Sequence, residues 1–145
     1  MNIEHKYFIR GRIEPGFISS EIAKHKCKTD IGAHSVFLGQ VRADETEGNK
    51  VSGIIYTSYS VMAEKEISRI REKILAKYEL KCLHIYHSIG EVLTGEISFF
   101  VFGSMSHRKN IYQAIEEAVN LVKKEVPIWK KELTVSSQSK TNINT

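Results

Sequence analysis

Apolar residues recur at helical spacing in two long stretches of the chain. From Val61 to about Lys77, and again from Ile111 to Val122, apolar side chains follow one another at helical intervals among charged and polar ones. This spacing predicts two main amphipathic helices, the second of which is the last helix of the chain. A shorter helix is predicted over Ile18 to Lys26, with Ser19 or Ser20 near its start.

Runs of β-branched and aromatic residues predict the strands of a sheet. They cover Ile3–Ile9, Ser35–Arg42, Val51–Tyr59, Leu83–His87 and Glu96–Phe102. The second and third runs flank the polar loop ADETEGNK, which predicts a hairpin, whereas SIGEVLTG between the last two runs is predicted to be rich in turns. Strands before, between and after two main helices indicate an α+β fold built on a largely antiparallel sheet.

Length and composition are those of one globular domain. With 145 residues and 41% hydrophobic content, the chain can bury one sizeable core, so residues 1–145 are predicted to form a single domain. The end of the chain, residues 134–145, is poor in apolar residues and is predicted to be a flexible tail.

Cysteine usage and hydropathy predict a cytoplasmic protein. Cys27 and Cys82 lie far apart without a CxxC pattern, which fits a reducing compartment. No run approaches the roughly 18 apolar residues of a membrane span, and the first residues, MNIEHKYFIR, do not resemble a signal peptide. The net charge of +4 favours anionic partners only weakly, so a phosphorylated ligand, an acidic protein and nucleic acid all stay open.

The segment LVKKEVPIWKKE places two lysine pairs on either side of a proline and the only tryptophan. A helix cannot run through Pro127, so the chain must change direction between the pairs and can bring Lys123 and Lys130 together. Two ammonium groups close together and partly shielded by Trp129 would lower each other's pKa, which suits a general acid or base. The alternative is a helix end with solvated lysines that complement the helix dipole.

Three further cationic residues are candidates for anion binding. Arg42 ends the first glycine-bearing strand, and His107 and Arg108 are predicted to open the last helix directly after GSMS. Free backbone N–H groups and the helix dipole favour a phosphate or carboxylate at such a start. Alternatively, Ser104 or Ser106 caps the helix and His107 packs as an ordinary half-buried ring.

The histidines do not predict a metal site. His84 and His87 are three apart on a predicted strand and should point to opposite faces, which makes joint chelation unfavourable. The scattered histidines give no ligand cluster in the sequence. Neither a metal nor an organic cofactor is expected.

Five fragments in one order resemble the large, catalytic subunit of molybdopterin synthase. They are FLGQVR from Phe37 to Arg42, YSVMAEKEI from Tyr59, IGEVLTGE from Ile89, SHR ending at Arg108, and Lys123 followed by VPIWKKE through Glu132. Each fragment alone is weak evidence, but together they cover roughly residues 30–133 with family-like spacing. The chain is therefore identified as a member of this family, which implies a hammerhead-like α/β fold.

The resemblance implies a sulfurtransferase of molybdenum cofactor biosynthesis. Such an enzyme takes sulfur from the C-terminal thiocarboxylate of a small ubiquitin-like partner subunit. It installs two sulfurs in cyclic pyranopterin monophosphate and so forms the dithiolene of molybdopterin. The resemblance also implies a central homodimer of large subunits with one small subunit at each end, and no nucleic-acid or membrane partner.

The resemblance also assigns roles to residues. Lys123 and Lys130 match the two active-site lysines of the family. Substrate-binding positions are matched by Arg42, His107 and Arg108, while Phe37 and Lys131 lie in matching pocket segments. These residue types suit the chemistry, because fixed cations hold an anionic pterin phosphate and lysines serve proton transfers and oxyanion stabilisation.

One geometric inference does not depend on the resemblance. If the last helix runs unbroken from Arg108 to Lys123, these residues lie roughly 22 Å apart. Both can serve one site in a symmetric dimer in which His107 and Arg108 of one subunit complete the pocket holding Lys123 and Lys130 of the other.

Two other function classes remain as alternatives. One is a nucleic-acid-binding module in which the lysines around Trp129 act collectively. The other is a non-catalytic adaptor for a ubiquitin-like protein, which would bind the small partner without turning over the pterin.

Overall fold

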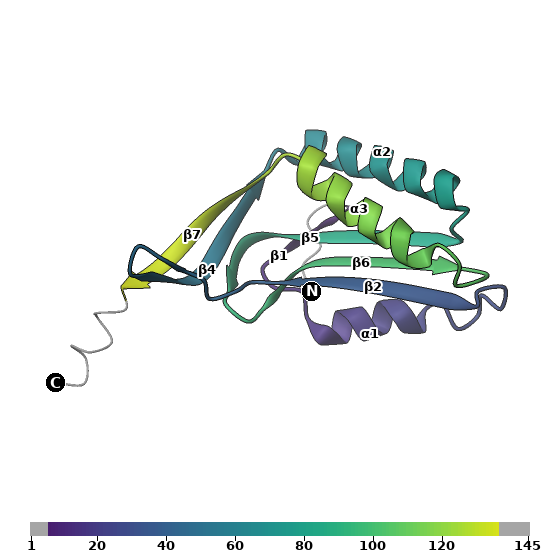
Figure 1. Cartoon of the computed structure of the whole chain (residues 1–145), viewed down its shortest axis with the longest axis horizontal. Helices are drawn as coiled ribbons and strands as arrows, with labels where there is room; N and C mark the ends of the chain where they lie inside the picture. Colours follow the sequence, from purple (N-terminus) through teal and green to yellow (C-terminus); the bar gives the residue numbers. More distant parts are fainter. Residues whose placement is uncertain (1–5, 137–145) are drawn as a thin grey trace.

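The computed structural model describes residues 6–136, which form a sheet with helices on both faces (Figure 1). The helices are α1 (Pro15–Ala23), α2 (Ser60–Tyr78) and α3 (Ile111–Glu125). The strands are β1 (Phe8–Arg10), β2 (Ala33–Gln40), β3 (Glu45–Thr46), β4 (Asn49–Ser58), β5 (Cys82–Leu93), β6 (Ile97–Met105) and β7 (Ile128–Ser136). The predicted α+β class is confirmed, with two main helices and a sheet in which the pairings are antiparallel except that of β1 with β5.

The helices divide the body into layers. Figure 1 shows α2 and α3 side by side over one face of β5, β6 and β2, with α1 on the other face. The paired strands β4 and β7 extend from this body as a long ribbon. The main core lies beneath α2 and α3, where Ile67, Ile70 and Ile74 are fully buried, and each contributes roughly 1.5–3 kcal/mol to folding.

A second core lies beneath α1. It joins Ile13 and Ile18 to Phe100 and Phe102 of β6, whose rings stack at a centroid distance of 6.3 Å. The aromatic pair belongs to the opposite face of β6 from Phe99 and Val101, which pack in the main core. Because both faces of β6 are covered, its side chains are almost continuously buried.

The predicted hairpin between β2 and β4 is wrong. β2 pairs with β6, whereas β4 pairs with β5 and β7. The intervening polar loop forms a smaller hairpin of its own, because Glu47 and Gly48 both adopt positive φ and turn β3 back onto the start of β4.

The segment predicted to be rich in turns is mostly strand. β5 pairs with β6 up to His87 and with β4 from Gly90 onward, so one strand belongs to both parts of the sheet. The change of partner occurs at Gly90, whose φ of +83° is accessible to glycine and strained for other residues. The chain reverses only after Leu93, where the N–H of Glu96 donates to the Leu93 carbonyl.

Several element boundaries differ from the sequence predictions. α1 begins at Pro15, earlier than predicted, because proline is well suited to the first helical turn. α3 begins at Ile111, so His107 and Arg108 precede the helix and do not open it. No side chain caps α3, which removes the proposed capping role of Ser104 and Ser106.

The ends of the described region also bear on the predictions. The first predicted strand is represented by β1, and its residues 3–5 lie outside the described residues. Residues 134–136 belong to β7 and not to a tail, while the rest of the predicted tail, residues 137–145, lies outside the described residues. Within residues 6–136, no helix is both long and apolar enough to cross a membrane.

Candidate functional site

A pocket of about 410 Å³ opens where β2, β4, β7 and the end of α3 meet. This volume is in the range of small-molecule sites. Its wall combines three cations with apolar and acidic side chains. The lining residues are Phe37, Leu38, Gly39, Gln40, Val41, Arg42, Asp44, Val51, Ile54, Tyr56, His87, Ser98, Phe99, Lys123, Lys130 and Glu132.

The break at Pro127 brings the two lysines to this pocket. α3 ends at Glu125, Val126 is extended, and β7 starts at Ile128 and runs antiparallel to β4. Lys130 therefore lies opposite Tyr56, and both side chains line the same pocket as Lys123 from the last turn of α3. The predicted change of direction between the lysine pairs is confirmed.

Lys123 is the lysine with the most perturbed environment in this pocket. Its side chain is exposed, but the ammonium group lies 5.8 Å from the centre of the Phe99 ring. Loss of solvent around the ammonium, followed by repulsion from Lys130 and Arg42, lowers the pKa of Lys123. The direction of this shift makes Lys123 a candidate for proton transfer.

Trp129 does not shield the lysines. Adjacent residues of a strand point to opposite faces, so Trp129 lies on the other side of β7 from Lys130, half exposed and packed edge-on against Tyr59 at 5.1 Å. The cause of the lowered Lys123 pKa is therefore the pocket itself and its cations. Trp129 is thus separated from the two pocket lysines, Lys123 and Lys130, and shares its face of β7 with Lys131.

The floor of the pocket contains residues that the sequence did not indicate. Tyr56 donates a hydrogen bond from its hydroxyl to Ser98 Oγ at 3.0 Å, and burial raises its pKa. The His87 ring packs against Tyr56 and Phe99, and its Nδ1–H donates to the Ser88 carbonyl at 2.7 Å. Burial is the main cause that lowers the pKa of His87 to about 4, with Lys123 and Lys130 adding to it.

Phe37 and Lys131 differ in their relation to the pocket. Phe37 lines it and packs edge-on against Phe99 at 5.6 Å. Lys131 is exposed, lies opposite Ile55 and does not line the pocket, because it points to the other face of β7 from Lys130.

His107 and Arg108 lie at the other end of α3. Both are exposed and line a separate open hollow with Lys109 and Asn110, just before the helix begins. The stretch of α3 from Ile111 to Lys123 spans roughly 18 Å, and it separates this hollow from Lys123. Within one chain, the structure therefore brings Arg42, Lys123 and Lys130 together and leaves His107 and Arg108 apart.

Comparison with known proteins places this pocket in a family. The model of the MoaE protein family matches residues 14–125, well over half of the chain. The chain belongs to the MoaE family. The matched region contains Arg42, His107, Arg108 and Lys123, whereas Lys130 lies beyond it. The family predicted from the sequence is confirmed, and with it the enzyme class, a sulfurtransferase of molybdenum cofactor biosynthesis.

Several relatives carry the name molybdopterin synthase catalytic subunit. The chain is 43% identical to one from Pyrococcus abyssi over 103 residues, which cover 71% of this chain and 69% of that protein. It is 43% identical to one from Dictyostelium discoideum over 103 residues, which cover 70% of this chain and 65% of that protein. A Drosophila grimshawi relative is 36% identical over 132 residues, and the chain spans only 35% of its length.

Solved structures share the fold. The molybdopterin synthase of Staphylococcus aureus superposes with a TM-score of 0.79 at 30% identity, covering 94% of this chain and 96% of that one. A structure described as the complex of subunits 1 and 2 of the Helicobacter pylori molybdopterin-converting factor gives a TM-score of 0.74 at 23% identity, covering 91% and 89%. At this lower identity, the similarity to the Helicobacter pylori structure shows a shared fold alone.

The expectation that this MoaE-family chain has no cluster of metal-binding side chains is wrong. His25, Cys82 and His84 place one potential ligand atom each within 4.8 Å of one another. His84 and His87 do point to opposite faces of β5, as predicted, but the partner of His84 is His25, which follows α1.

The buried His87 predicts a loss of stability in acid. Its pKa is about 4 in the folded chain and 6.5 in the unfolded one, so the unfolded state binds the proton first as the pH falls. Stability should therefore decrease between about pH 6.5 and pH 4, by about 3 kcal/mol from this group. Urea unfolding across this range should show a weaker pH dependence in His87→Gln than in the unsubstituted chain. The exposed His107→Gln is the control, and an equal pH dependence in all three proteins would contradict the assignment.

Proposed function

We propose that the pocket lined by Arg42, Lys123 and Lys130 is the site of sulfur transfer in a cytoplasmic catalytic subunit of molybdopterin synthase. Sulfur would come from the C-terminal thiocarboxylate of a small ubiquitin-like subunit and pass to cyclic pyranopterin monophosphate to form the dithiolene. The observation that carries the proposal is the convergence of these three cations on one pocket, with the pKa of Lys123 lowered.

Arg42 is suited to bind the phosphate of the substrate. Its guanidinium pairs with Asp44 at 3.2 Å, and its side chain is 82% exposed, so it can turn to a ligand at little cost. Opening of the cyclic phosphate increases the negative charge, and a cation beside the phosphate stabilises the opened form more strongly than the closed one. A larger, open hollow around Arg12 is less suited to this role, because Arg12 is paired with Glu14 and Glu96.

The two lysines are suited to the proton transfers that accompany sulfur attack. Lys123 acts as acid and base beside the terminal glycine of the partner, because loss of solvent and the nearby cations lower its pKa and so favour release of its proton. Lys130 protonates or stabilises the oxyanion that develops when the thiocarboxylate gives up its sulfur. The buried Tyr56 and His87 support this arrangement from the pocket floor.

A homodimer accounts for the remaining cations. His107 and Arg108 are too far along α3 to reach the Lys123 pocket of their own chain. A twofold arrangement of two large subunits, with one small subunit at each end, would let these residues complete the pocket of the other large subunit. Phe37 flanks the site from within the pocket, whereas Lys131 does not line it.

Substitution of Lys123 tests the catalytic role. The purified chain is assayed with the cyclic pyranopterin and a thiocarboxylated small subunit. Lys123→Ala should reduce turnover by about 10²–10⁴-fold, because it removes a general acid and base. Lys124→Ala is the matched control, since the neighbouring lysine is exposed and does not line the pocket. Equal activity of the two variants would contradict the proposal, and binding of the partner without turnover by the unsubstituted chain would favour the adaptor alternative.

Mixing of variants tests the shared site. Arg108→Ala and Lys123→Ala are each expected to be impaired alone, but their heterodimer retains one complete site. An equal mixture after subunit exchange should therefore recover about a quarter of the unsubstituted activity, since half of the dimers are mixed and each has one intact site. A mixture of Lys123→Ala with Lys130→Ala should not recover, because these two residues belong to the same subunit. Absence of recovery in the first mixture, with exchange verified by mass spectrometry, would contradict sharing.

A further inference from the structure

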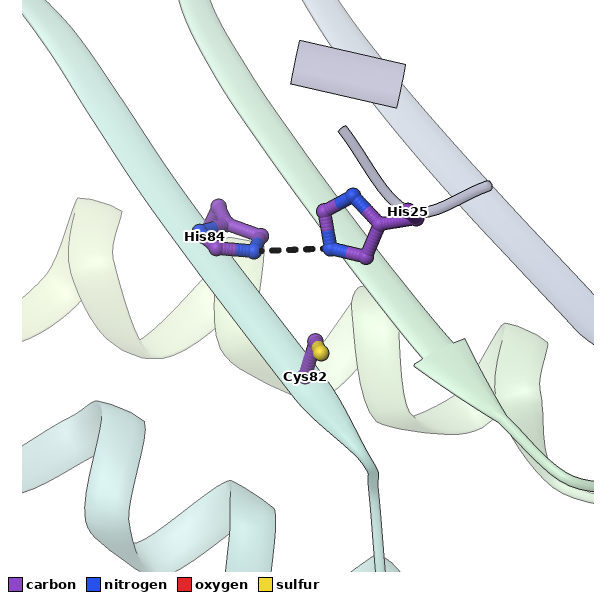
Figure 2. A group of neighbouring side chains, drawn as sticks. All are labelled: His25, Cys82 and His84. Carbon is purple, nitrogen blue, oxygen red and sulfur yellow. Dashed lines mark hydrogen bonds between the residues drawn. The ribbon is translucent and has the colours of Figure 1, made fainter. Parts of the chain in front are cut away.

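Two histidines and a cysteine converge on the face of the sheet opposite the lysine pocket. Cys82 and His84 are two apart on β5 and therefore point to the same face, where His25 reaches them from the segment that follows α1. Figure 2 shows the two imidazoles turned toward each other, with the Cys82 sulfur beside them. None of the three lines the pocket that contains Lys123.

The potential ligand atoms of this cluster are close enough together to bind one metal ion. The Nε2 atoms of His25 and His84 are 3.1 Å apart, and all three potential ligand atoms lie within 4.8 Å of one another. Ligand atoms around a tetrahedral zinc ion lie roughly 3.3–3.8 Å apart, since the bonds measure about 2.0–2.3 Å. Small side-chain rotations therefore suffice to bring the three atoms onto one ion.

A backbone contact orients the His25 ring for coordination. Nδ1 of His25 lies 2.9 Å from the Glu21 carbonyl oxygen, which can only accept, so Nδ1 carries the proton. In the neutral ring, Nε2 then keeps a lone pair, and this atom faces His84. A backbone carbonyl behind one nitrogen, with the other free to coordinate, is the usual support of a metal-binding histidine.

Cys82 is placed to supply the anionic ligand. It is buried, and Lys28 Nζ lies 3.1 Å from its sulfur, where the ammonium balances the charge of a thiolate.

Ring packing alone explains only part of this cluster. His84 stacks on Phe102 at 5.8 Å and His25 packs edge-on against the same ring at 4.8 Å, which accounts for the position of the imidazoles in the α1 core. It does not account for a buried thiol and an ammonium directly beside them. His34 is close to His25, but its Nδ1 is bonded to Ser104 Oγ at 2.7 Å.

We propose that His25, Cys82 and His84 form a binding site for a divalent transition metal that prefers nitrogen and sulfur ligands, with Zn²⁺ the best match. Binding replaces the thiol proton of Cys82 by the metal and requires the His84 ring to carry its proton on Nδ1. The fourth position is filled by solvent, since His84 is only partly buried. The metal ties the segment after α1 to β5 and is remote from the proposed sulfur-transfer pocket, so its role is to stabilise the fold.

Cobalt binding provides the direct test. The full-length chain, treated with chelator and kept reduced, is titrated with Co²⁺, which reports a thiolate ligand through a sulfur-to-metal charge-transfer band. One equivalent should bind and give this band, and Zn²⁺ should displace it. Zn²⁺ at a hundredfold excess over its Kd should also raise the Tm by about 10 °C.

Variants separate this site from adventitious binding. Cys82→Ser should abolish the charge-transfer band, and His84→Gln and His25→Gln should each weaken binding by at least tenfold. Cys27→Ser is the matched control and should retain the band, because Cys27 is exposed and outside the cluster. Circular dichroism of the metal-free variants verifies their fold, and His25→Gln decides the question if Cys82→Ser does not fold. Absence of the band in the unsubstituted chain, its loss in Cys27→Ser, or unchanged binding in His25→Gln would overturn the proposal.

Discussion

The candidate site depends on holding three mutually repelling cations around one pocket. Arg42 follows the end of β2, Lys123 lies in the last turn of α3 and Lys130 lies on β7, so no local segment contains the arrangement. The fold holds the cations together through the break at Pro127 and the long pairing of β7 with β4. Loss of solvent, followed by repulsion from Lys130 and Arg42, lowers the pKa of Lys123 and makes this lysine a candidate acid and base.

The sequence predicted the features that follow from local pattern. The apolar spacing located α2 and α3, and Pro127 located the break between the lysine pairs, because both rest on the stereochemistry of the helix itself. The predictions from the sequence were wrong where contacts between distant segments determine the structure. The order of strands follows from long-range pairing, so the polar loop after β2 was mistaken for the link of a larger hairpin. Gly90 bends a continuous strand, yet in the sequence it resembles a turn residue.

In the pocket, too, some residues could be predicted from the sequence and others could not. The cations could be proposed from the sequence because their residue types suit an anionic substrate and their fragments resemble a family. Tyr56 and His87 carried no such signal, since their place in the floor depends on the register of β4 and β5. Trp129 was assigned to the wrong side, although the alternation along a strand would have placed it opposite Lys130 once β7 was recognised. His25 and His84 are 59 residues apart, and nothing in their spacing indicates contact.

The sheet thus separates two groups of chemically active side chains. Phe99 belongs to the face beneath α3, and its ring lies under Lys123, whereas Phe102 belongs to the α1 face and packs against His25 and His84. One face carries the cations suited to a phosphorylated pterin and the other carries nitrogen and sulfur ligands suited to a metal. Residues of β5 and β6 contribute to both groups, so the pairing of these two strands positions each group.

The most direct test of this account is the pKa of Lys123 itself, measured by NMR titration of its side-chain carbon resonances. The account predicts a value below the ordinary 10.5, which rises in Lys130→Ala and in Arg42→Ala because a repelling charge is removed. Lys131→Ala should leave the value unchanged, because that side chain points away from the pocket. An ordinary pKa for Lys123, or the same pKa in all of these proteins, would contradict the claim that the three cations share one site.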